Sequence, residues 1–179
     1  MKSFIMFLTY LRILFGPLIF VLSVFYEMFL ASLILFILCS VSDFLDGYLA
    51  RKFNEESSLG KLLDPVADKI LLCSAILAII LITNDYFIGL MGVLILIREF
   101  WVSGLREFTA INHIQHASDV SYLAKIKTTL QFIAITSYFY SFSYSLSLGI
   151  FLSSFLLFLS LLVSIKTGLT YTINVLRLK

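Results

Sequence analysis

The chain has 179 residues, of which 60% are hydrophobic and 13% charged, and its formal net charge is +2. Soluble domains are usually about half apolar and about a quarter charged, so this composition indicates an integral membrane protein. The small net charge gives no reason to expect a nucleic-acid partner, and the placement of the charges matters more than their sum. No internal repeat or low-complexity linker is visible, and we expect a single domain over residues 1–179.

Apolar runs along the chain predict an all-α membrane protein with six transmembrane helices. A helix needs roughly 20 mostly apolar residues to span a bilayer. The connections between the runs are short, so consecutive helices are expected to be antiparallel neighbours. The expected ranges are about 4–25, 29–52, 60–83, 85–106, 118–141 and 146–170.

The basic residues predict the orientation of these helices. All thirteen Lys and Arg residues fall in four stretches, at 2–12, 51–69, 98–127 and 166–179. Basic residues favour the cytoplasmic side of a membrane. We therefore expect both termini and the loops near 53–60 and 107–117 in the cytoplasm, and a multi-pass protein of the inner (cytoplasmic) membrane.

Four carboxylates stand in or beside the second and third apolar runs, namely Asp43, Asp46, Asp64 and Asp68. An ionised carboxylate in hydrocarbon is costly unless a cation or a water-filled cavity compensates it. The first two are three residues apart and the last two are four apart, so each pair shares one face of its helix. Adjacent helices can bring all four together as ligands for hard cations such as Mg²⁺ or Mn²⁺. Two such ions would neutralise a diphosphate substrate.

Charges of both signs share the inner part of the predicted bilayer. Asp43 precedes Lys52, at the cytoplasmic end of its helix, by a stretch that spans roughly 13 Å of helix. Arg12 and Arg98 are placed in the same way at a depth of roughly 12 Å. Because isolated charges facing lipid are costly, this pattern predicts a polar cavity open to the cytoplasm.

Small residues and one arginine accompany the carboxylates. Gly47, Ala50 and Gly60 share the acidic helix faces, where small residues either allow close helix packing or make room for a nucleotide or phosphate. Arg51 can pair with an aspartate or with a phosphate oxygen. The spacing alone leaves these alternatives open.

The pattern Asp43-x2-Asp46-Gly47-x2-Ala50-Arg51-x8-Gly60-x3-Asp64-x3-Asp68 resembles the signature of the CDP-alcohol phosphatidyltransferases at every fixed position. This resemblance implies that an alcohol displaces CMP from a CDP-linked lipid, with two divalent ions, Mg²⁺ or Mn²⁺. It implies metal ligation by the four aspartates and a second role for Asp68 as general base. The residues expected to bind the CDP-lipid are Asp46, Gly47, Ala50, Arg51, Gly60 and Asp64.

Within this family, the segments SDFLDGYLAR, GKLLDPVADK, REFWVSGLR and KIKT are similar to those of the phosphatidylglycerophosphate synthase branch. The implied acceptor is sn-glycerol 3-phosphate, and the implied product besides CMP is phosphatidylglycerophosphate. The chain departs from the branch pattern at two places, since no Pro-Asn pair precedes Leu8-Thr9 and Ala124 stands where Gly often precedes Lys-x-Lys-Thr. The residues expected to bind the phosphate of the acceptor are Arg106, Lys125, Lys127, Arg12 and Thr9.

Alternatives remain for the basic residues and for the function. Arg106 and the two lysines can be interfacial cations with their stems along the bilayer, and Arg98 and Glu99 can form a structural pair. Serine or an inositol phosphate can be the acceptor, and a divalent-cation transporter can use the acids as its path. The resemblance also implies a homodimer, in contact with membrane lipids. His113 and His116 are expected in a solvated loop.

Overall fold

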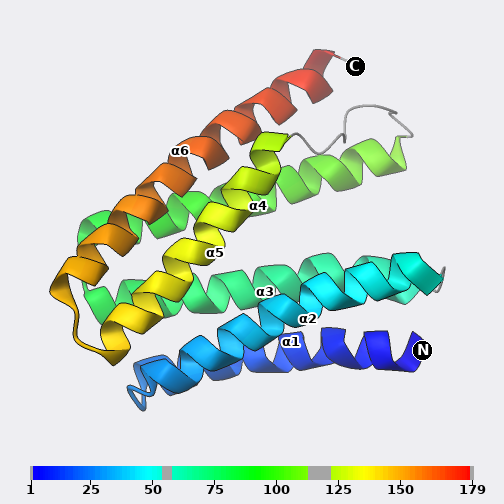
Figure 1. Cartoon of the computed structure of the whole chain (residues 1–179). Helices are drawn as coiled ribbons and strands as arrows, with labels where there is room; N and C mark the ends of the chain where they lie inside the picture. The colour runs from blue at the N-terminus through cyan, green and yellow to red at the C-terminus, as the bar shows by residue number, and fades with distance from the viewer. Residues whose placement is uncertain (1, 54–57, 113–121, 178–179) are drawn as a thin grey trace. The chain divides into compact units, whose positions relative to one another are not determined.

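The structure is a computed structural model that describes residues 2–53, 58–112 and 122–177. In this part of the chain it contains six α-helices (Figure 1): α1 Lys2–Val24, α2 Phe29–Phe53, α3 Ser58–Thr83, α4 Tyr86–Ile111, α5 Tyr122–Ser143 and α6 Ser147–Arg177. The expected helices are confirmed as helices, with somewhat different ends. Residues 118–121 of the fifth expected range lie outside the described residues.

The helices α4 and α6 continue beyond the ranges 85–106 and 146–170 that the sequence predicts. The extra turn of α4 ends at Asn112, whose N–H donates to the carbonyl of Phe108 at 3.1 Å. The expected ranges take their length from the thickness of a bilayer, whereas backbone hydrogen bonding can continue a helix past the membrane surface. Bilayer thickness therefore gives a minimum length for these helices.

Contacts between the helices divide the chain into two compact units. The first unit contains Met1–Asn84 and Tyr138–Leu146, and the second contains Asp85–Ser137 and Ser147–Lys179. The helices α1, α2 and α3 belong to the first unit, α4 and α6 belong to the second, and α5 is divided between them. The expectation of one domain stays a prediction.

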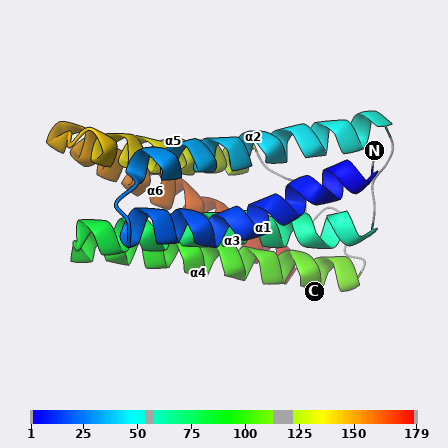
Figure 2. The same ribbon diagram turned by 90° about the horizontal axis from the view of Figure 1, so that it is seen from below.

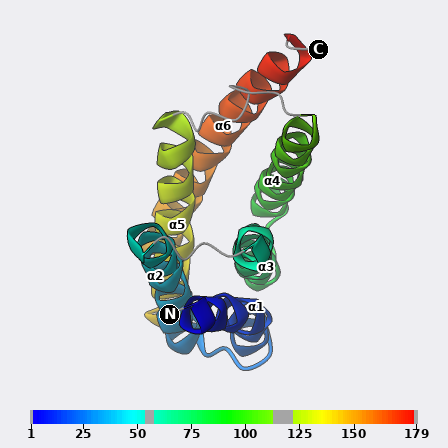
Figure 3. The same ribbon diagram turned by 90° about the vertical axis from the view of Figure 1, so that its right-hand side faces the viewer.

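In the first unit, α1 packs against both α2 and α3, and its contact with α3 is the more extensive. Figure 2 shows α1 running alongside α3, and the end-on view of Figure 3 shows it next to both helices. A Cβ added to Gly16 would lie 3.0 Å from Cγ2 of Ile70 and 3.3 Å from its backbone carbonyl. Small residues allow helices in membranes to approach closely. Gly16 therefore sets the distance between α1 and α3.

In the second unit, α4 packs against α6. Asp85 caps the N-terminus of α4, where its carboxylate accepts a hydrogen bond from the N–H of Phe87 at 2.7 Å. Gly168 on α6 makes room for Arg98 on α4, since a Cβ added to this glycine would lie 3.2 Å from both Cγ and Nε of the arginine. Each unit thus has a glycine at its main helix contact.

Four helical segments among the described residues are long and apolar enough to cross a membrane, namely Met6–Val24, Leu62–Thr83, Tyr86–Ile111 and Ser147–Arg177. A further apolar helical segment among the described residues, Phe29–Asp43 in α2, is shorter than these four. Many large apolar side chains are exposed on the helices, which suits contact with lipid. These findings describe an all-helical membrane protein.

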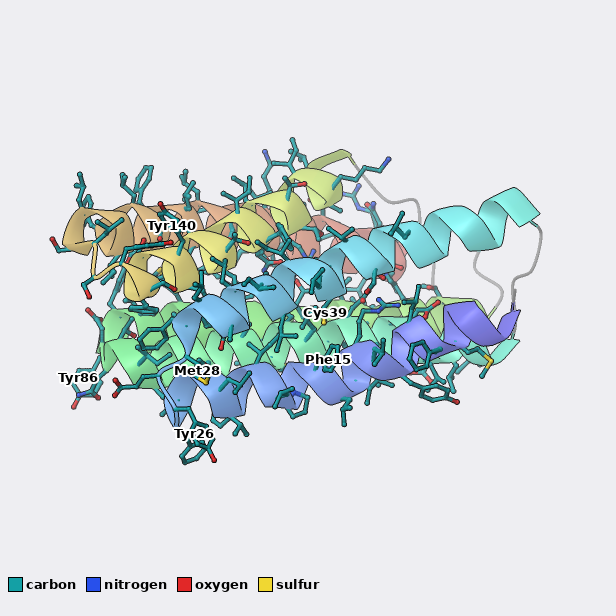
Figure 4. The ribbon with its side chains drawn as sticks, turned by 60° about the horizontal axis from the view of Figure 1, so that its bottom comes forward. Phe15, Tyr26, Met28, Cys39, Tyr86 and Tyr140 are labelled. Carbon is teal, nitrogen blue, oxygen red and sulfur yellow. The ribbon has the colours of Figure 1, made fainter. Side chains whose placement is uncertain are left out.

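Two exposed tyrosines lie near helix ends. Figure 4 shows Tyr26, in the turn after α1, and Tyr86, at the start of α4, projecting away from the ribbon. Their exposed fractions are 67% and 98%. Tyrosine is enriched where a membrane meets water. Each of these side chains is therefore suited to anchor its helix end at such an interface.

Candidate functional site

Three carboxylates from α2 and α3 converge on the guanidinium of Arg12, which lies on α1. Nη1 of Arg12 donates to Oδ1 of Asp43 and to Oδ1 of Asp68, the second at 2.5 Å. Nη2 lies 3.4 Å from Oδ1 of Asp64. The same Asp64 oxygen accepts a hydrogen bond of 2.8 Å from Oγ1 of Thr9. We call these five side chains the acidic cluster.

Helical spacing explains how the acidic cluster forms. Thr9 and Arg12 are three residues apart on α1, and Asp64 and Asp68 are four apart on α3, so each pair lies on one face of its helix. Gly16 follows Arg12 by one turn and holds α1 close to α3. The close approach at the glycine therefore lets the arginine reach the aspartates.

The arginine is covered, whereas the carboxylates are accessible. The side chain of Arg12 is 0% exposed, while those of Asp43, Asp64 and Asp68 are 44%, 38% and 50% exposed. A buried charge is costly unless it is paired and hydrogen-bonded. The three acids compensate the buried guanidinium and still present surface from which a ligand can approach.

In the second unit, one carboxylate lies between two cations. Lys127 on α5 donates through Nζ to Oε1 of Glu99 on α4, and Nη1 of Arg98 donates to the same oxygen at 3.2 Å. The side chains of Arg98, Glu99 and Lys127 are 12%, 17% and 7% exposed. We call these three side chains the basic cluster, because its cations outnumber its acid.

The helix α6 supplies further partners for Arg98. Nε of Arg98 donates to the backbone carbonyl of Ser164 at 2.9 Å, and Nη2 donates to Oγ1 of Thr167 at 2.8 Å. In the second unit, three buried polar atoms have no hydrogen-bond partner among the described residues, namely Nε2 of Gln131, Oγ of Ser164 and Oη of Tyr171. The second unit therefore keeps hydrogen-bonding capacity that its own described side chains do not use.

Comparison with known proteins shows the family. Residues 6–166 match the family model described as CDP-alcohol phosphatidyltransferase. The chain belongs to the CDP-alcohol phosphatidyltransferase family. The match includes all four aspartates of the sequence pattern and both clusters.

Several relatives that share one name are similar to most of this chain. A CDP-diacylglycerol–glycerol-3-phosphate 3-phosphatidyltransferase of Rickettsia typhi is 43% identical over 138 residues, 76% of this chain and 75% of the relative. A protein of the same name from Wigglesworthia glossinidia brevipalpis is 37% identical over 163 residues, 87% of this chain and 88% of the relative. That of Escherichia coli K12 is 37% identical over 134 residues, 72% of this chain and 71% of the relative.

The structure describes part of the family's acidic pattern in this chain. Asp43, Asp64 and Asp68 are brought together, whereas the side chain of Asp46 lies outside the described part of the structure. Gly60 is buried in α3. The other expected CDP-lipid residues belong to the helical backbone of α2, but their side chains are outside the described part; these are Gly47, Ala50 and Arg51.

The residues expected to bind the acceptor's phosphate fall in different places. Arg12 and Thr9 belong to the acidic cluster, and Lys127 belongs to the basic cluster. Cζ of Arg106 lies 5.9 Å from the ring centroid of Tyr171, at the distance of a cation–π contact, and the side chain of Lys125 is exposed. His113 and His116, expected in a loop, lie outside the described residues.

The donor atoms of the acidic cluster suit a divalent cation, because carboxylate oxygens are the ligands that Mg²⁺ and Mn²⁺ prefer. Among the described residues, however, no group of three or more His, Cys, Asp or Glu side chains is arranged to hold a metal ion. The contacts supply a reason, since Nη1 of Arg12 takes the position between Asp43 and Asp68. The chemistry of these residues fits the metals of the family, and their present arrangement fits a guanidinium.

Two partners in these clusters were not predicted from the sequence. Arg12, expected on a phosphate, contacts aspartates in this structure; its predicted depth in the membrane, which it shares with the aspartates, was a usable signal. A structural pair of Arg98 and Glu99 was one of the alternatives left open, and that contact is present, but the contact of Glu99 with Lys127 was not foreseen. That contact joins α4 to α5, and nothing in the spacing along the chain indicates it.

Proposed function

We propose that this chain transfers a phosphatidyl group from CDP-diacylglycerol to sn-glycerol 3-phosphate, forming phosphatidylglycerophosphate and CMP. The observation that carries the proposal is the convergence of Asp43, Asp64 and Asp68 at one point between helices. Membership of the family and the name shared by its relatives support the choice of substrates.

The acidic cluster, together with Asp46, is the proposed site of two divalent ions. Mg²⁺ or Mn²⁺ bound by Asp43, Asp46, Asp64 and Asp68 would neutralise the diphosphate of the CDP-lipid. The carboxylates are available for this role because each described one is at least 38% exposed. Gly47, Ala50, Arg51 and Gly60 are the proposed neighbours of the nucleotide and its phosphates.

Asp68 is the proposed general base. A hydroxyl oxygen of glycerol 3-phosphate forms a bond to the phosphorus of the phosphatidyl group, and the phosphorus–oxygen bond to CMP breaks. The hydroxyl proton passes to a carboxylate oxygen of Asp68, which requires a half-exposed side chain beside the diphosphate. Positioning and charge neutralisation supply most of the rate in such transfers, so the chain needs no covalent nucleophile.

The second unit is the proposed binding region for the phosphate of the acceptor. Lys127, Lys125 and Arg106 are its cations, and guanidinium and ammonium groups bind phosphate well. Glu99 opposes two cations in the basic cluster, which leaves net positive charge in a mostly buried setting. The unpartnered polar atoms of Gln131, Ser164 and Tyr171 add potential hydrogen bonds.

The proposal also includes the arrangement in the membrane. We infer six membrane-spanning helices, both termini and a polar cavity on the cytoplasmic side, and a location in the inner membrane. The distribution of Lys and Arg along the chain supports this orientation. A homodimer is part of the same proposal and rests on the family resemblance.

The test is release of CMP by the purified full chain in detergent micelles. With CDP-diacylglycerol and Mn²⁺ present, CMP is expected when glycerol 3-phosphate is added and not when it is withheld. Serine and inositol phosphate serve as alternative acceptors in parallel reactions. CMP release with either of these, but not with glycerol 3-phosphate, would reassign the acceptor. Flux of Mn²⁺ into liposomes without any CMP release would favour a transporter.

A further inference from the structure

The buried cation of the acidic cluster is the guanidinium of Arg12, a residue of the chain itself. Arg12 is 0% exposed and contacts carboxylates from two different helices, whereas those carboxylates are about half exposed. An arginine at this depth in an apolar helix needs compensating charge, and clustered carboxylates need a cation. When no metal is bound, the arginine therefore supplies the positive charge for the carboxylates, and the carboxylates supply the negative charge for the arginine.

The carboxylates that contact Arg12 are also the proposed metal ligands. Nη1 of Arg12 donates to Oδ1 of Asp43 and to Oδ1 of Asp68, so it occupies the position between α2 and α3 that a shared ion would take. A divalent ion binds carboxylate oxygens at about 2.0–2.6 Å, which is too close for a guanidinium nitrogen to remain between the same oxygens. Contact with Arg12 and ligation of an ion there exclude one another.

We propose that Arg12 is the counter-ion of the metal-free acidic cluster, and that divalent cations bind by displacing its guanidinium from Asp43 and Asp68. This inference rests on the proposed metal site. It adds that the affinity for metal is set by competition with a residue of the chain. Arg12 is a positioning residue in this role, because it acts through the aspartates and not on the reacting atoms.

Displacement requires movement of a side chain and not of a helix. The packing of α1 on α3 is fixed at Gly16 and Ile70, one turn beyond Arg12, by contacts that do not involve the guanidinium. The long arginine stem has several rotatable bonds, and the fork of donors can re-pair with a phosphate as readily as with a carboxylate. The expected contact of Arg12 with phosphate and its observed contact with aspartates then belong to two states of one side chain.

The test compares Mn²⁺ binding by the full chain and its variants in detergent micelles, without nucleotide or lipid substrate, by titration calorimetry. Arg12→Gln removes the competing cation, and its Kd for Mn²⁺ is expected to fall on the order of tenfold, within the usual range of coupling between two ligands. Lys166→Gln is the matched control, because Lys166 is an exposed cation on α6. Its Kd is expected to equal that of the parent.

Thermal unfolding separates competition from a purely structural role. Without metal, Arg12→Gln leaves the aspartates without their counter-ion, so its midpoint is expected below that of the parent. With saturating Mn²⁺ the difference is expected to shrink, because the ions replace the missing charge. A deficit of equal size with and without Mn²⁺ would overturn the proposal.

A second variant keeps the test decisive if Arg12→Gln does not fold. Arg12→Lys retains the charge but loses the fork that spans two carboxylates, so its Kd for Mn²⁺ is expected to fall by a smaller factor. Unchanged or weaker Mn²⁺ binding in the folded variants, with CMP release by the parent intact, would overturn displacement and leave the proposed function standing. If the parent binds no Mn²⁺, the metal site and this inference both fail.

Discussion

The acidic cluster and the basic cluster each place one charge among several of the opposite sign. In the first unit, Arg12 faces three described carboxylates, and in the second, Glu99 faces Arg98 and Lys127. The accessibility differs, however. The majority charges of the acidic cluster are 38% to 50% exposed, whereas those of the basic cluster are 7% and 12% exposed.

This difference in accessibility distinguishes an ion pair whose partner can be exchanged from an ion pair that is kept. Half-exposed carboxylates can exchange their partner for an ion that arrives from water, so their pairing with Arg12 is suited to be replaced. The nearly buried cations of the basic cluster offer much less surface for an exchange of their ion-pair partner, and removal of one member of a buried pair is costly. Arg98 is also held by α6 through Ser164 and Thr167. The acidic cluster is therefore suited to exchange of its counter-ion, and the basic cluster is suited to keep its own ion pairs while its net positive charge stays available to an anion.

The largest effect is expected in the acidic cluster. Asp68→Asn removes the proposed base and one ligand, so CMP release is expected to fall by about 10²- to 10⁴-fold, while the helical content stays that of the parent. The measurements are CMP release and circular dichroism. Asp85→Asn, at the N-terminus of α4, is the control, because asparagine caps helices as well as aspartate does. Turnover near that of the parent in Asp68→Asn would remove Asp68 from the role of base.

In the basic cluster, Glu99→Gln is expected to act on stability. It leaves two mostly buried cations without their acid, and loss of one partner of a buried pair costs about 3 kcal/mol or more. Thermal unfolding is expected to show a lower midpoint that Mn²⁺ does not restore, in contrast to Arg12→Gln. The double variant Glu99→Gln with Lys127→Gln is expected to recover part of the loss. If Mn²⁺ restored the unfolding midpoint of Glu99→Gln, the proposal that only the acidic cluster exchanges its counter-ion for a metal would be wrong.

Sequence reasoning was sufficient for the helices and for the chemical type of the acidic cluster. The apolar runs predict six helices because length and hydrophobicity are local properties, and the spacing of Asp64 and Asp68 places them on one face for the same reason. The contact of Arg12 with Asp43 and that of Lys127 with Glu99 depend on which helices pack together. Periodicity along one helix carries no information about the neighbouring helix.

A smaller effect is expected where a cation of the second unit is exposed. Arg106→Ala removes a proposed contact to the acceptor's phosphate, which is worth about 1.5 kcal/mol, or about a tenfold rise in KM for glycerol 3-phosphate. The KM for CDP-diacylglycerol is expected to stay unchanged, and steady-state kinetics with each substrate varied would measure both. Lys166→Ala, at another exposed cation, is expected to alter neither value. An unchanged KM in Arg106→Ala would exclude the contact.

Effects on stability alone, and not on substrate binding, are expected at the glycines of the two main helix contacts. Gly16→Ala places a Cβ 3.3 Å from the backbone of Ile70, and backbone in a packed helix can yield only if the helices shift, at about 1–3 kcal/mol. Gly168→Ala instead meets the side chain of Arg98 at 3.2 Å, which can give way. Alanine also favours a helix over glycine by up to about 1 kcal/mol, so the net change at Gly168 is expected near zero.

The unfolding midpoints of the two glycine variants therefore compare how far the packing at each helix contact can adjust to an added Cβ. A loss of stability at Gly16, without one at Gly168, is expected if the distance between α1 and α3 determines whether Arg12 reaches Asp68. Equal losses would mean that the stem of Arg98 is as immovable as a helix backbone, because its bonds to Ser164 and Thr167 leave it no room to adjust. The side chain of Arg98 would then resist a change at Gly168 as strongly as the packing of α1 on α3 resists one at Gly16.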